Sequence, residues 1–303
     1  MKKKILITGG SGFIGSSVKK YLNELGFEVL TIGRGKKEDF QFDLISGLSG
    51  EKPLKKIIKD FSPDIVCHFA SGSNIVNANK NKEKEFNDTV LSTKYLIEVL
   101  KELKLEKFIY LSSQAVYGLP KTLPVSELHP TNPTTVYGEN KLEIENIITQ
   151  SKLNYLIFRA SSVYGALQNP EKSGAIANFI NKIRSNQSPV VFNSFDLYSD
   201  FIYIDDVACA VVKSIQDGSR KCEIYNLGFG KATTLREILN ILYRYFSNAP
   251  EPKLMINDLY PSKEQKGLYL DISKIQRELK WNTKYNIEEG LGLILKSMPL
   301  KTI

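Results

Sequence analysis

The stretch ILITGGSGFIG, residues 5–15, decides the fold class of this chain. A short apolar run typical of a buried strand leads into a glycine-rich turn, and an amphipathic segment typical of a helix follows. Gly9 permits the tight turn, Gly12 lets backbone N–H groups approach a pyrophosphate, and Gly15 lets the helix pack closely on the strand. Because the start of a helix also offers unpaired N–H groups to phosphates, this stretch predicts a dinucleotide-binding site.

The same strand-then-helix pattern repeats through the first half of the chain. Alternation of this kind implies right-handed crossovers between parallel strands, so we expect an α/β fold with a Rossmann-type, doubly wound parallel sheet. Expected strands cover residues 5–8, 29–32, 64–70, 108–113 and 155–160, and expected helices cover residues 13–25, 85–103 and 135–151.

The second half is less regular, and it predicts a smaller, mixed, substrate-binding region. We expect residues 1–165 to form the dinucleotide-binding domain and residues 166–303 to form mainly the substrate-binding region. Residues of about 200–230 are expected to return to the first domain, because they again read as strand then helix. Asp205 is the expected N-cap of that helix.

Composition limits the classes of function. The 303 residues include 41 Lys plus Arg against 33 Asp plus Glu, a formal net charge of +8. Because the lysines are spread along the chain beside glutamates, we expect solvated helix faces and no nucleic-acid surface. No apolar run approaches the roughly 20 residues that span a bilayer, so no membrane segment is expected. Three cysteines and two histidines, without disulfide or zinc spacing, favour the cytoplasm and no metal.

Further motifs follow the glycine turn along the chain. They are DIVCHFAS (64–71), LSSQAVYG (111–118), YGENK (137–141), RASSVYG (159–165), SDFIYIDDVACA (199–210) and LDISKIQRELKW (270–281). In this order, and at about these intervals, the chain resembles the extended short-chain dehydrogenase/reductase family, which contains nucleotide-sugar epimerases, dehydratases and reductases. The resemblance extends over nearly the whole chain. It rests on the co-occurrence of the motifs, because none of them is specific alone.

The resemblance implies a chemical role for Tyr137 and Lys141. Spacing alone says only that the two residues share a helix face. In the family, the tyrosine is the general acid/base that exchanges a proton with the sugar while hydride passes to or from the nicotinamide. A free tyrosine has a pKa of about 10, so a cation one helical turn away and the charge of the nicotinamide favour its phenolate. Ser113 completes the expected catalytic set, because its hydroxyl orients the reacting oxygen of the substrate.

The residue that ends the second strand indicates which dinucleotide is bound. An acid at this position binds the ribose 2′-hydroxyl of NAD, but the matching residue is Gly33 and Arg34 follows it. A guanidinium grips a 2′-phosphate, so NADP is the expected cofactor and NAD the alternative. A solvated loop is the competing interpretation of Arg34. The resemblance implies further cofactor contacts at Phe13, Ile14, Asp43, Leu44, Phe69, Ala70, Ser71 and Leu111, besides Tyr137 and Lys141.

Departures from the family pattern indicate the reaction. In the 4,6-dehydratases of the family the hydroxyl residue is followed by Asp-Glu, whereas Gln114 and Ala115 stand here, so elimination is not expected. Usual nucleotide contacts of UDP-sugar 4-epimerases are replaced at Ser162 and Ser199, which argues against a standard UDP-galactose epimerase. Gln114 and Ser162 are still expected to contact the substrate, and Lys263 is a candidate diphosphate contact with a solvated loop lysine as the equal alternative.

The leading expectation is an NADPH-dependent reductase of a nucleotide-diphosphate-linked 4-keto-6-deoxyhexose. The runner-up is a nucleotide-sugar C4 epimerase that retains its dinucleotide, because the two activities share every catalytic residue. A non-catalytic NADP-sensing protein is a distant alternative, since it does not need all three catalytic residues. The family commonly dimerises through the helices that match residues 85–103 and 135–151, so we expect a homodimer that uses a second apolar face on them.

Overall fold

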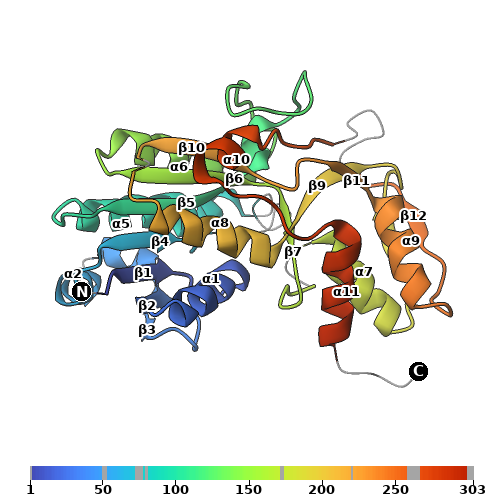
Figure 1. Cartoon of the computed structure of the whole chain (residues 1–303), viewed down its shortest axis with the longest axis horizontal. Helices are drawn as coiled ribbons and strands as arrows, with labels where there is room; N and C mark the ends of the chain where they lie inside the picture. Colours follow the sequence, from blue (N-terminus) through green and yellow to red (C-terminus); the bar gives the residue numbers. More distant parts are fainter. Residues whose placement is uncertain are drawn as a thin grey trace.

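A computed structural model gives the fold, and it describes residues 2–49, 53–71, 78, 81–170, 174–219, 221–257 and 267–298. Figure 1 shows a wide sheet with helices packed against it, beside a smaller lobe that contains the last helix of the chain. The wide sheet is described first because it carries the glycine turn.

Seven strands form the large sheet, and every neighbouring pair in it is parallel. Their bounds are β1 Lys4–Thr8, β2 Glu28–Gly33, β3 Phe40–Gln41, β4 Ile65–His68, β5 Lys107–Ser113, β6 Tyr155–Ala160 and β10 Glu223–Leu227. Their order across the sheet is β10-β6-β5-β4-β1-β2-β3. The expected strands of the first half all belong to this sheet. β1, which leads into the glycine turn, therefore lies between β4 and β2.

Helices cover both faces of this sheet, as its apolar strands require. Successive side chains of β1 point to opposite faces, so Ile5 and Ile7 join one core while Leu6 joins the other. The first core is closed by α1 Phe13–Glu24, α8 Ile204–Gln216 and α10 Ser273–Leu279. The second core is closed by α2 Pro53–Phe61, α5 Ser92–Leu100 and α6 Val136–Gln150.

The helix expected over residues 85–103 is divided near its start. α4 (Lys82–Phe86) runs into a π-helical turn, η2 (Asn87–Leu91), and α5 follows. Within this segment the Thr89 hydroxyl donates to the Glu85 carbonyl at 2.6 Å. Hydroxyl groups that bond to the preceding turn compete with regular helix geometry, and π-turns of this kind are frequent at functional sites.

The smaller lobe consists of two short sheets and three helices. Their bounds are β7 Ser162–Tyr164, β8 Val190–Phe192, β9 Tyr198–Tyr203, β11 Ala232–Thr234, β12 Lys253–Met255, α7 Ala175–Arg184, α9 Leu235–Tyr245 and α11 Ile287–Ser297. β9 pairs in parallel with β7 and antiparallel with β11, while β8 and β12 form a separate parallel pair. A third core lies within this lobe, and Phe179, Ile238 and Leu291 contribute to it from its three helices.

The chain passes repeatedly between the large sheet and the smaller lobe (Figure 1). β9 of the lobe runs directly into α8, which covers the large sheet, and β10 becomes an edge strand of that sheet. The chain then returns to the lobe with β11 and comes back again with α10, whose Ile275 packs in one core with Trp281. The second half of the chain therefore contributes elements to both the large sheet and the smaller lobe.

The start of α8 differs from the expected one. Asp205 was the expected N-cap, but the N-cap is Tyr203, and Asp205 stands in the first turn of the helix together with Asp206. Carboxylates are favourable in a first helical turn because the N-terminal end of the helix dipole is positive. The side chain of Asp206 also accepts hydrogen bonds from the backbone N–H groups of Lys284 and Tyr285.

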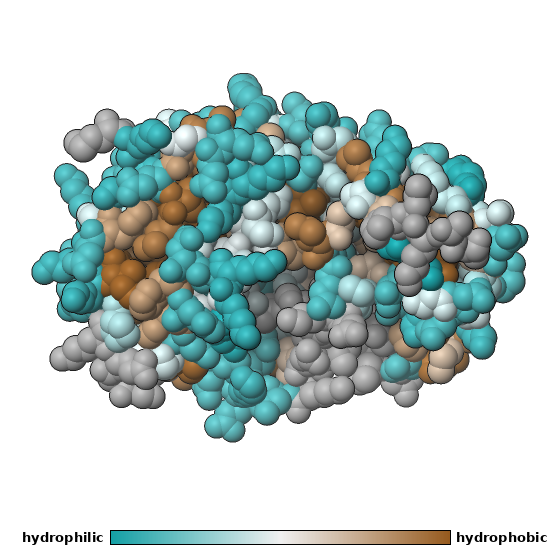
Figure 2. Space-filling model, turned by 90° about the horizontal axis from the view of Figure 1, so that it is seen from below, coloured by the Kyte–Doolittle hydropathy of each residue, from teal (hydrophilic) through white to brown (hydrophobic). Residues whose placement is uncertain are grey.

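Hydrophilic residues cover much of the face seen in Figure 2, with smaller hydrophobic areas between them. The exposed positions of α5 and α6 are also polar, as shown by Lys94 and Glu98 on α5 and by Glu139, Glu143 and Asn146 on α6. The exposed positions of α5 and α6 therefore supply no second apolar face for dimerisation, whereas Phe86 of α4, within the helix expected over residues 85–103, is 40% exposed. The homodimer stays a prediction.

Two expected absences can be examined within the described part of the chain. No helix there is long and apolar enough to cross a membrane. No group of three or more His, Cys, Asp and Glu side chains there is placed to hold a metal ion. Cys67, Cys209 and Cys222 all carry free thiols.

Candidate active site

The glycine-rich turn is tightly packed. Gly9 has a φ of 74°, and a Cβ at this residue would lie 2.9 Å from the backbone nitrogen of Ala70. A Cβ at Gly15 would lie 2.2 Å from the carbonyl oxygen of Gly9, so a larger side chain would separate α1 from β1. α1 begins at Phe13 with Gly12 as its N-cap, and no side chain caps it. Its first N–H groups therefore suit an anion.

A hollow of about 480 Å³ opens beside this turn. Residues 10–13 line it together with Lys19, Lys20 and Lys37. Lys19 is paired with Asp39 at 3.0 Å. The combination of helix N–H groups and lysine charge suits phosphate groups, as expected of the glycine motif.

Lys141 is buried at the centre of the candidate site. Its Nζ donates to Ser71 Oγ at 2.8 Å and to the Leu111 carbonyl at 2.9 Å. The same nitrogen lies 5.7 Å from the ring centre of Tyr137 and 5.0 Å from that of Tyr110. Four of the residues expected at the cofactor, from β5, α6 and the loop after β4, are therefore brought together: Ser71, Leu111, Tyr137 and Lys141.

Tyr137 and Ser113 meet where β5 ends and α6 begins. Thr135 caps α6 by accepting from the backbone N–H of Gly138, which places Tyr137 in the first turn, one turn before Lys141. Ser113 is the last residue of β5, and its hydroxyl lies near enough to the phenol of Tyr137 to lower the pKa of that phenol. The three expected catalytic residues thus form one cluster at the carboxyl end of the sheet.

Burial sets the protonation of this cluster. Desolvation raises the pKa of Tyr137, the hydrogen bond from Ser113 lowers it, and the charge of Glu85 raises it. Desolvation lowers the pKa of Lys141 to about 7, while the charges of Glu145 and Glu85 raise it. The phenol therefore holds its proton at neutral pH unless a further positive charge acts on it.

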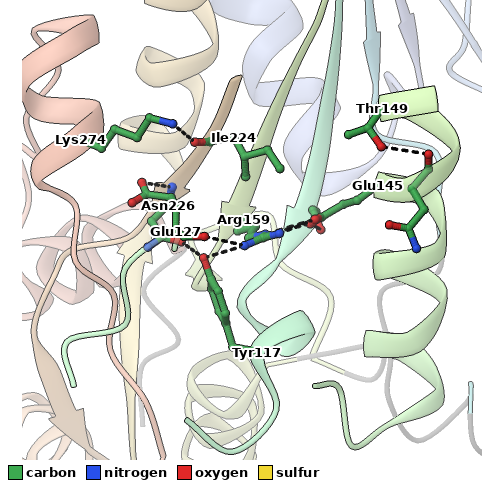
Figure 3. Close-up of polar contacts among 10 residues, drawn as sticks. Tyr117, Glu127, Glu145, Thr149, Arg159, Ile224, Asn226 and Lys274 are labelled. Atoms are coloured by element: carbon green, nitrogen blue, oxygen red, sulfur yellow. Dashed lines mark hydrogen bonds and ion pairs between the residues drawn. The ribbon is translucent and has the colours of Figure 1, made fainter. Parts of the chain in front are cut away.

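A buried polar network links α6 to the large sheet (Figure 3). Arg159 on β6 forms a forked ion pair with Glu145, one turn after Lys141, at 2.7–3.2 Å. Arg159 also donates to the phenol oxygen of Tyr117 at 3.1 Å, and that phenol donates to Asn226 at 2.6 Å. Burial lowers the pKa of Arg159, but the hydrogen bonds and the charge of Glu145 outweigh this effect. The pKa is raised overall, so the guanidinium stays charged. The network fixes α6 against β5, β6 and β10.

A neutral histidine on β4 links β1 to α5. His68 Nδ1 lies 2.6 Å from Thr8 Oγ1, and its Nε2 lies 2.8 Å from Thr93 Oγ1. Burial and then the charge of Lys141 lower the pKa of His68 to about 3, so the ring is neutral. Phe69 follows directly, and its N–H donates to the Thr8 carbonyl at 3.1 Å.

Three polar side chains from distant segments of the chain meet after the end of β5. Gln114 Nε2 donates to Ser199 Oγ at 3.0 Å, and Ser199 Oγ lies 2.9 Å from Ser162 Oγ. Gln114 Oε1 is buried and makes no hydrogen bond within the described part of the chain. The expected substrate residues Gln114 and Ser162 are therefore joined through Ser199. Lys263, the other expected contact, lies outside the described residues.

The residues expected to contact the adenosine half of the dinucleotide, Arg34, Asp43 and Leu44, are less closely grouped. Arg34 contacts Asp88 at 3.1 Å, Lys84 contacts the same carboxyl oxygen at 2.6 Å, and the Arg34 side chain is 62% exposed. Leu44 is buried in the second core and starts the short 3₁₀ helix η1 (Leu44–Ser49). The Asp43 carbonyl accepts the Ser46 hydroxyl at that helix start.

Two acidic residues near the site were missed by sequence reasoning. Glu85 on α4 acts electrostatically on Tyr137 and Lys141, and its own pKa is raised by burial and then by Asp88. Glu38 accepts from the Ser11 backbone N–H at 2.8 Å and from its hydroxyl at 2.7 Å. Neither residue stands in one of the family motifs, so only the path of the chain reveals their positions.

Comparison with known proteins gives a consistent result. The model of the "NAD dependent epimerase/dehydratase family" matches residues 5–228. A putative UDP-glucose 4-epimerase of Methanocaldococcus jannaschii is 33% identical over 97% of this chain and 98% of its own. The dTDP-4-dehydro-6-deoxyglucose reductase of Escherichia coli is 28% identical over 99% of both chains. A solved UDP-glucose 4-epimerase of Thermus thermophilus in complex with NAD has a TM-score of 0.86 at 23% identity, over 97% of this chain and 100% of that one, which confirms the predicted fold class.

Proposed function

Because the chain belongs to the NAD-dependent epimerase/dehydratase family, as an enzyme of the extended short-chain dehydrogenase/reductase type, we propose that it inverts C4 of a nucleotide-diphosphate sugar. The observation that carries this proposal is the cluster of half-buried Ser113 and Tyr137 with buried Lys141 near the glycine turn. A non-catalytic dinucleotide sensor would not require these three side chains so close together.

The residues of the groove fit a nicotinamide dinucleotide. The uncapped start of α1 and the lysines of the hollow suit its pyrophosphate, and Lys141 with Ser71 suits the ribose beside the nicotinamide. When bound, such a dinucleotide would supply the acceptor for hydride from C4 and the donor that delivers hydride to the opposite face of the same carbon. A side chain at Gly9 or Gly15 would close the approach to the backbone, because it would collide with the groove wall or the turn itself.

Tyr137 is assigned the proton transfer. Its phenol oxygen takes the proton of the C4 hydroxyl and later returns it to the same oxygen, while the Ser113 hydroxyl orients that oxygen. Burial holds the pKa of Tyr137 above its ordinary value, so the base form requires positive charge nearby. Lys141, held by Ser71 and Leu111 one helical turn away, supplies it in its protonated form, and the charge of an oxidised nicotinamide would add to it.

The side chains around the cluster argue against elimination. Gln114 and Ala115 follow Ser113 where a dehydratase of the family has two acids. The nearby carboxylate of Glu145 is held by Arg159 and by the Ser112 hydroxyl, and it supports α6 instead.

An epimerase and a reductase of the family share these catalytic residues, so other observations decide which of the two activities is the first candidate. The relative at 33% identity, named a putative UDP-glucose 4-epimerase, supports epimerisation. The pairing of Arg34 with Asp88 also weakens the sequence-based argument for a reductase that draws on NADPH. Reduction of a nucleotide-linked 4-keto-6-deoxyhexose is the second candidate, supported by the Escherichia coli relative.

The joined side chains of Gln114, Ser162 and Ser199 are assigned to the sugar nucleotide. Ser162 and Ser199 offer hydroxyl groups where UDP-sugar epimerases usually have amide or charged contacts. Gln114 Oε1 has a lone acceptor position that a sugar hydroxyl would satisfy. We therefore expect the substrate to differ from UDP-galactose in its nucleotide or its sugar.

The test is to identify the retained dinucleotide and the product together. The protein is incubated with a panel of UDP- and dTDP-hexoses and with a dTDP-4-keto-6-deoxyhexose, and products are resolved by NMR, with Tyr137→Phe as the inactive control. A C4 epimer formed without consumption of added dinucleotide supports the epimerase. Stoichiometric oxidation of NADPH or NADH with the keto sugar would establish the reductase instead. Dinucleotide binding without turnover of any sugar would favour the sensor.

A further inference from the structure

The carboxyl end of β2 is occupied by an acid that the strand itself does not supply. β2 ends at Gly33, and Glu38, five residues later, folds back over it. A Cβ at Gly33 would lie 2.8 Å from Glu38 Oε1, so the carboxylate fills the space of a side chain at Gly33. The same carboxylate accepts two hydrogen bonds from Ser11 in the glycine turn.

The hydrogen bonding of this carboxylate is one-sided. Both donors of Ser11 go to Oε1. Oε2 is buried beside Gly10, whose added Cβ would lie 3.1 Å away, and it has no hydrogen-bond partner among the described residues. An ionised carboxylate has about four acceptor positions. Glu38 therefore has acceptor capacity left at the junction of the glycine turn and β2.

Two cations near this junction have acidic partners of their own. Arg34 shares its charge with Asp88, and Lys19 is paired with Asp39. Lys37 lines the hollow beside the turn, so it is the alternative determinant that the experiment includes.

We propose that Glu38 selects NAD over NADP, because its carboxylate accepts the adenosine ribose 2′-hydroxyl and repels a 2′-phosphate. In Rossmann folds this function belongs to an acid about 20 residues beyond the glycine motif. Here a residue of the following loop takes that place and allows Gly33 at the strand end. The inference rests on the proposed function only in that the chain binds a nicotinamide dinucleotide, and it opposes the NADP preference expected from Arg34.

The experiment measures equilibrium binding of NADH and NADPH to the full chain by nicotinamide fluorescence, after removal of any co-purified dinucleotide. We expect the parent to bind NADH at least about 10-fold more tightly than NADPH, and Glu38→Gln to reduce that ratio by about 10-fold or more, because one charge-assisted contact is lost. Glu38→Asp keeps the charge and should keep the preference for NADH.

The controls separate local from general charge effects. Glu102→Gln removes the same charge from an exposed residue paired with Lys55 and should leave the ratio unchanged. Thermal unfolding establishes that each variant is folded. A parent that prefers NADPH, or an unchanged ratio in folded Glu38→Gln, overturns the proposal. An NADPH preference lost in Arg34→Ala or Lys37→Ala identifies the alternative determinant. A parent that binds neither dinucleotide overturns the proposed function as well.

Discussion

The two ends of the dinucleotide groove are built differently. At the catalytic end, Lys141 is held by fixed groups on β5 and the loop after β4, and α6 is anchored by the buried pair of Glu145 and Arg159. At the adenosine end, Arg34 is largely exposed and Glu38 belongs to a loop. The residues proposed for catalysis therefore lie on regular helices and strands, while the residue proposed to select the cofactor lies on a loop that can change without disturbing the sheet.

The largest effect is expected at the catalytic end. Tyr137→Phe keeps the ring and its packing but removes the proton carrier. Turnover should fall by about 100- to 10,000-fold, with a melting temperature near that of the parent. Steady-state kinetics on the substrate identified above and thermal unfolding check this expectation. Near-parental turnover by the folded variant would remove the proposed mechanism.

The next largest effect is expected on stability, at the buried ion pair of Glu145 and Arg159. Glu145→Gln leaves Arg159 buried with its ion partner removed, and such a loss typically costs about 3–5 kcal/mol. Glu143→Gln, at an exposed position of the same helix, is the matched control and should change the free energy of unfolding by less than about 0.5 kcal/mol. Urea unfolding at pH 7 measures both. Equal values for the two variants would mean that the network does not hold α6.

Lys141 should make stability depend on pH. Its pKa is lowered from 10.5 to about 7 in the folded protein, so between these values the unfolded chain binds more protons than the folded one. Stability then rises with pH across this window, by at most about 1.4 kcal/mol for each pH unit. Lys141→Met lacks this penalty.

Urea unfolding of parent and Lys141→Met from pH 6 to 10 tests this sign. The variant should be most favoured, relative to the parent, below pH 7, and its advantage should shrink as the pH rises. Turnover and dinucleotide affinity should both fall in Lys141→Met. Its loss of turnover should not multiply with that of Tyr137→Phe, because the two residues act as one unit. A constant stability difference across the window would contradict the lowered pKa.

The smallest effect is expected at the adenosine end. Arg34→Ala breaks an ion pair in which the Arg34 side chain is 62% exposed, so unfolding free energy should change by only about 0.2–1 kcal/mol, and less in high salt. Urea unfolding at two ionic strengths measures this. A loss of several kcal/mol would show that this end is as firmly built as the catalytic end.

Sequence reasoning succeeded where function follows local spacing. The glycine turn, the strands β1, β2, β4, β5 and β6 and the i, i+4 relation of Tyr137 and Lys141 are all local patterns, and the structure contains each of them. β3 and β10 of the same sheet were not among the expected strands. Sequence reasoning failed where position depends on the path of the chain. The meeting of Gln114 with Ser199 joins residues 85 positions apart, and the return of Glu38 to Ser11 depends on one loop conformation. The turn η2 divides the helix expected over residues 85–103, and the Thr89 hydroxyl bonds to the preceding turn there. The spacing of apolar residues gives no signal of such a bond.

The repeated passage of the chain between the large sheet and the smaller lobe limits how this protein can be divided. β7 and β9 precede α8 and β10, whereas β11, α9 and β12 follow them, and α10 separates these from α11. Every continuous segment that contains the described elements of the lobe therefore also contains α8, β10 and α10, so the lobe cannot be transplanted alone onto a related sheet as a single segment. Exchange of substrate specificity with a relative has to proceed through individual loops and strand ends, each replaced within an intact chain.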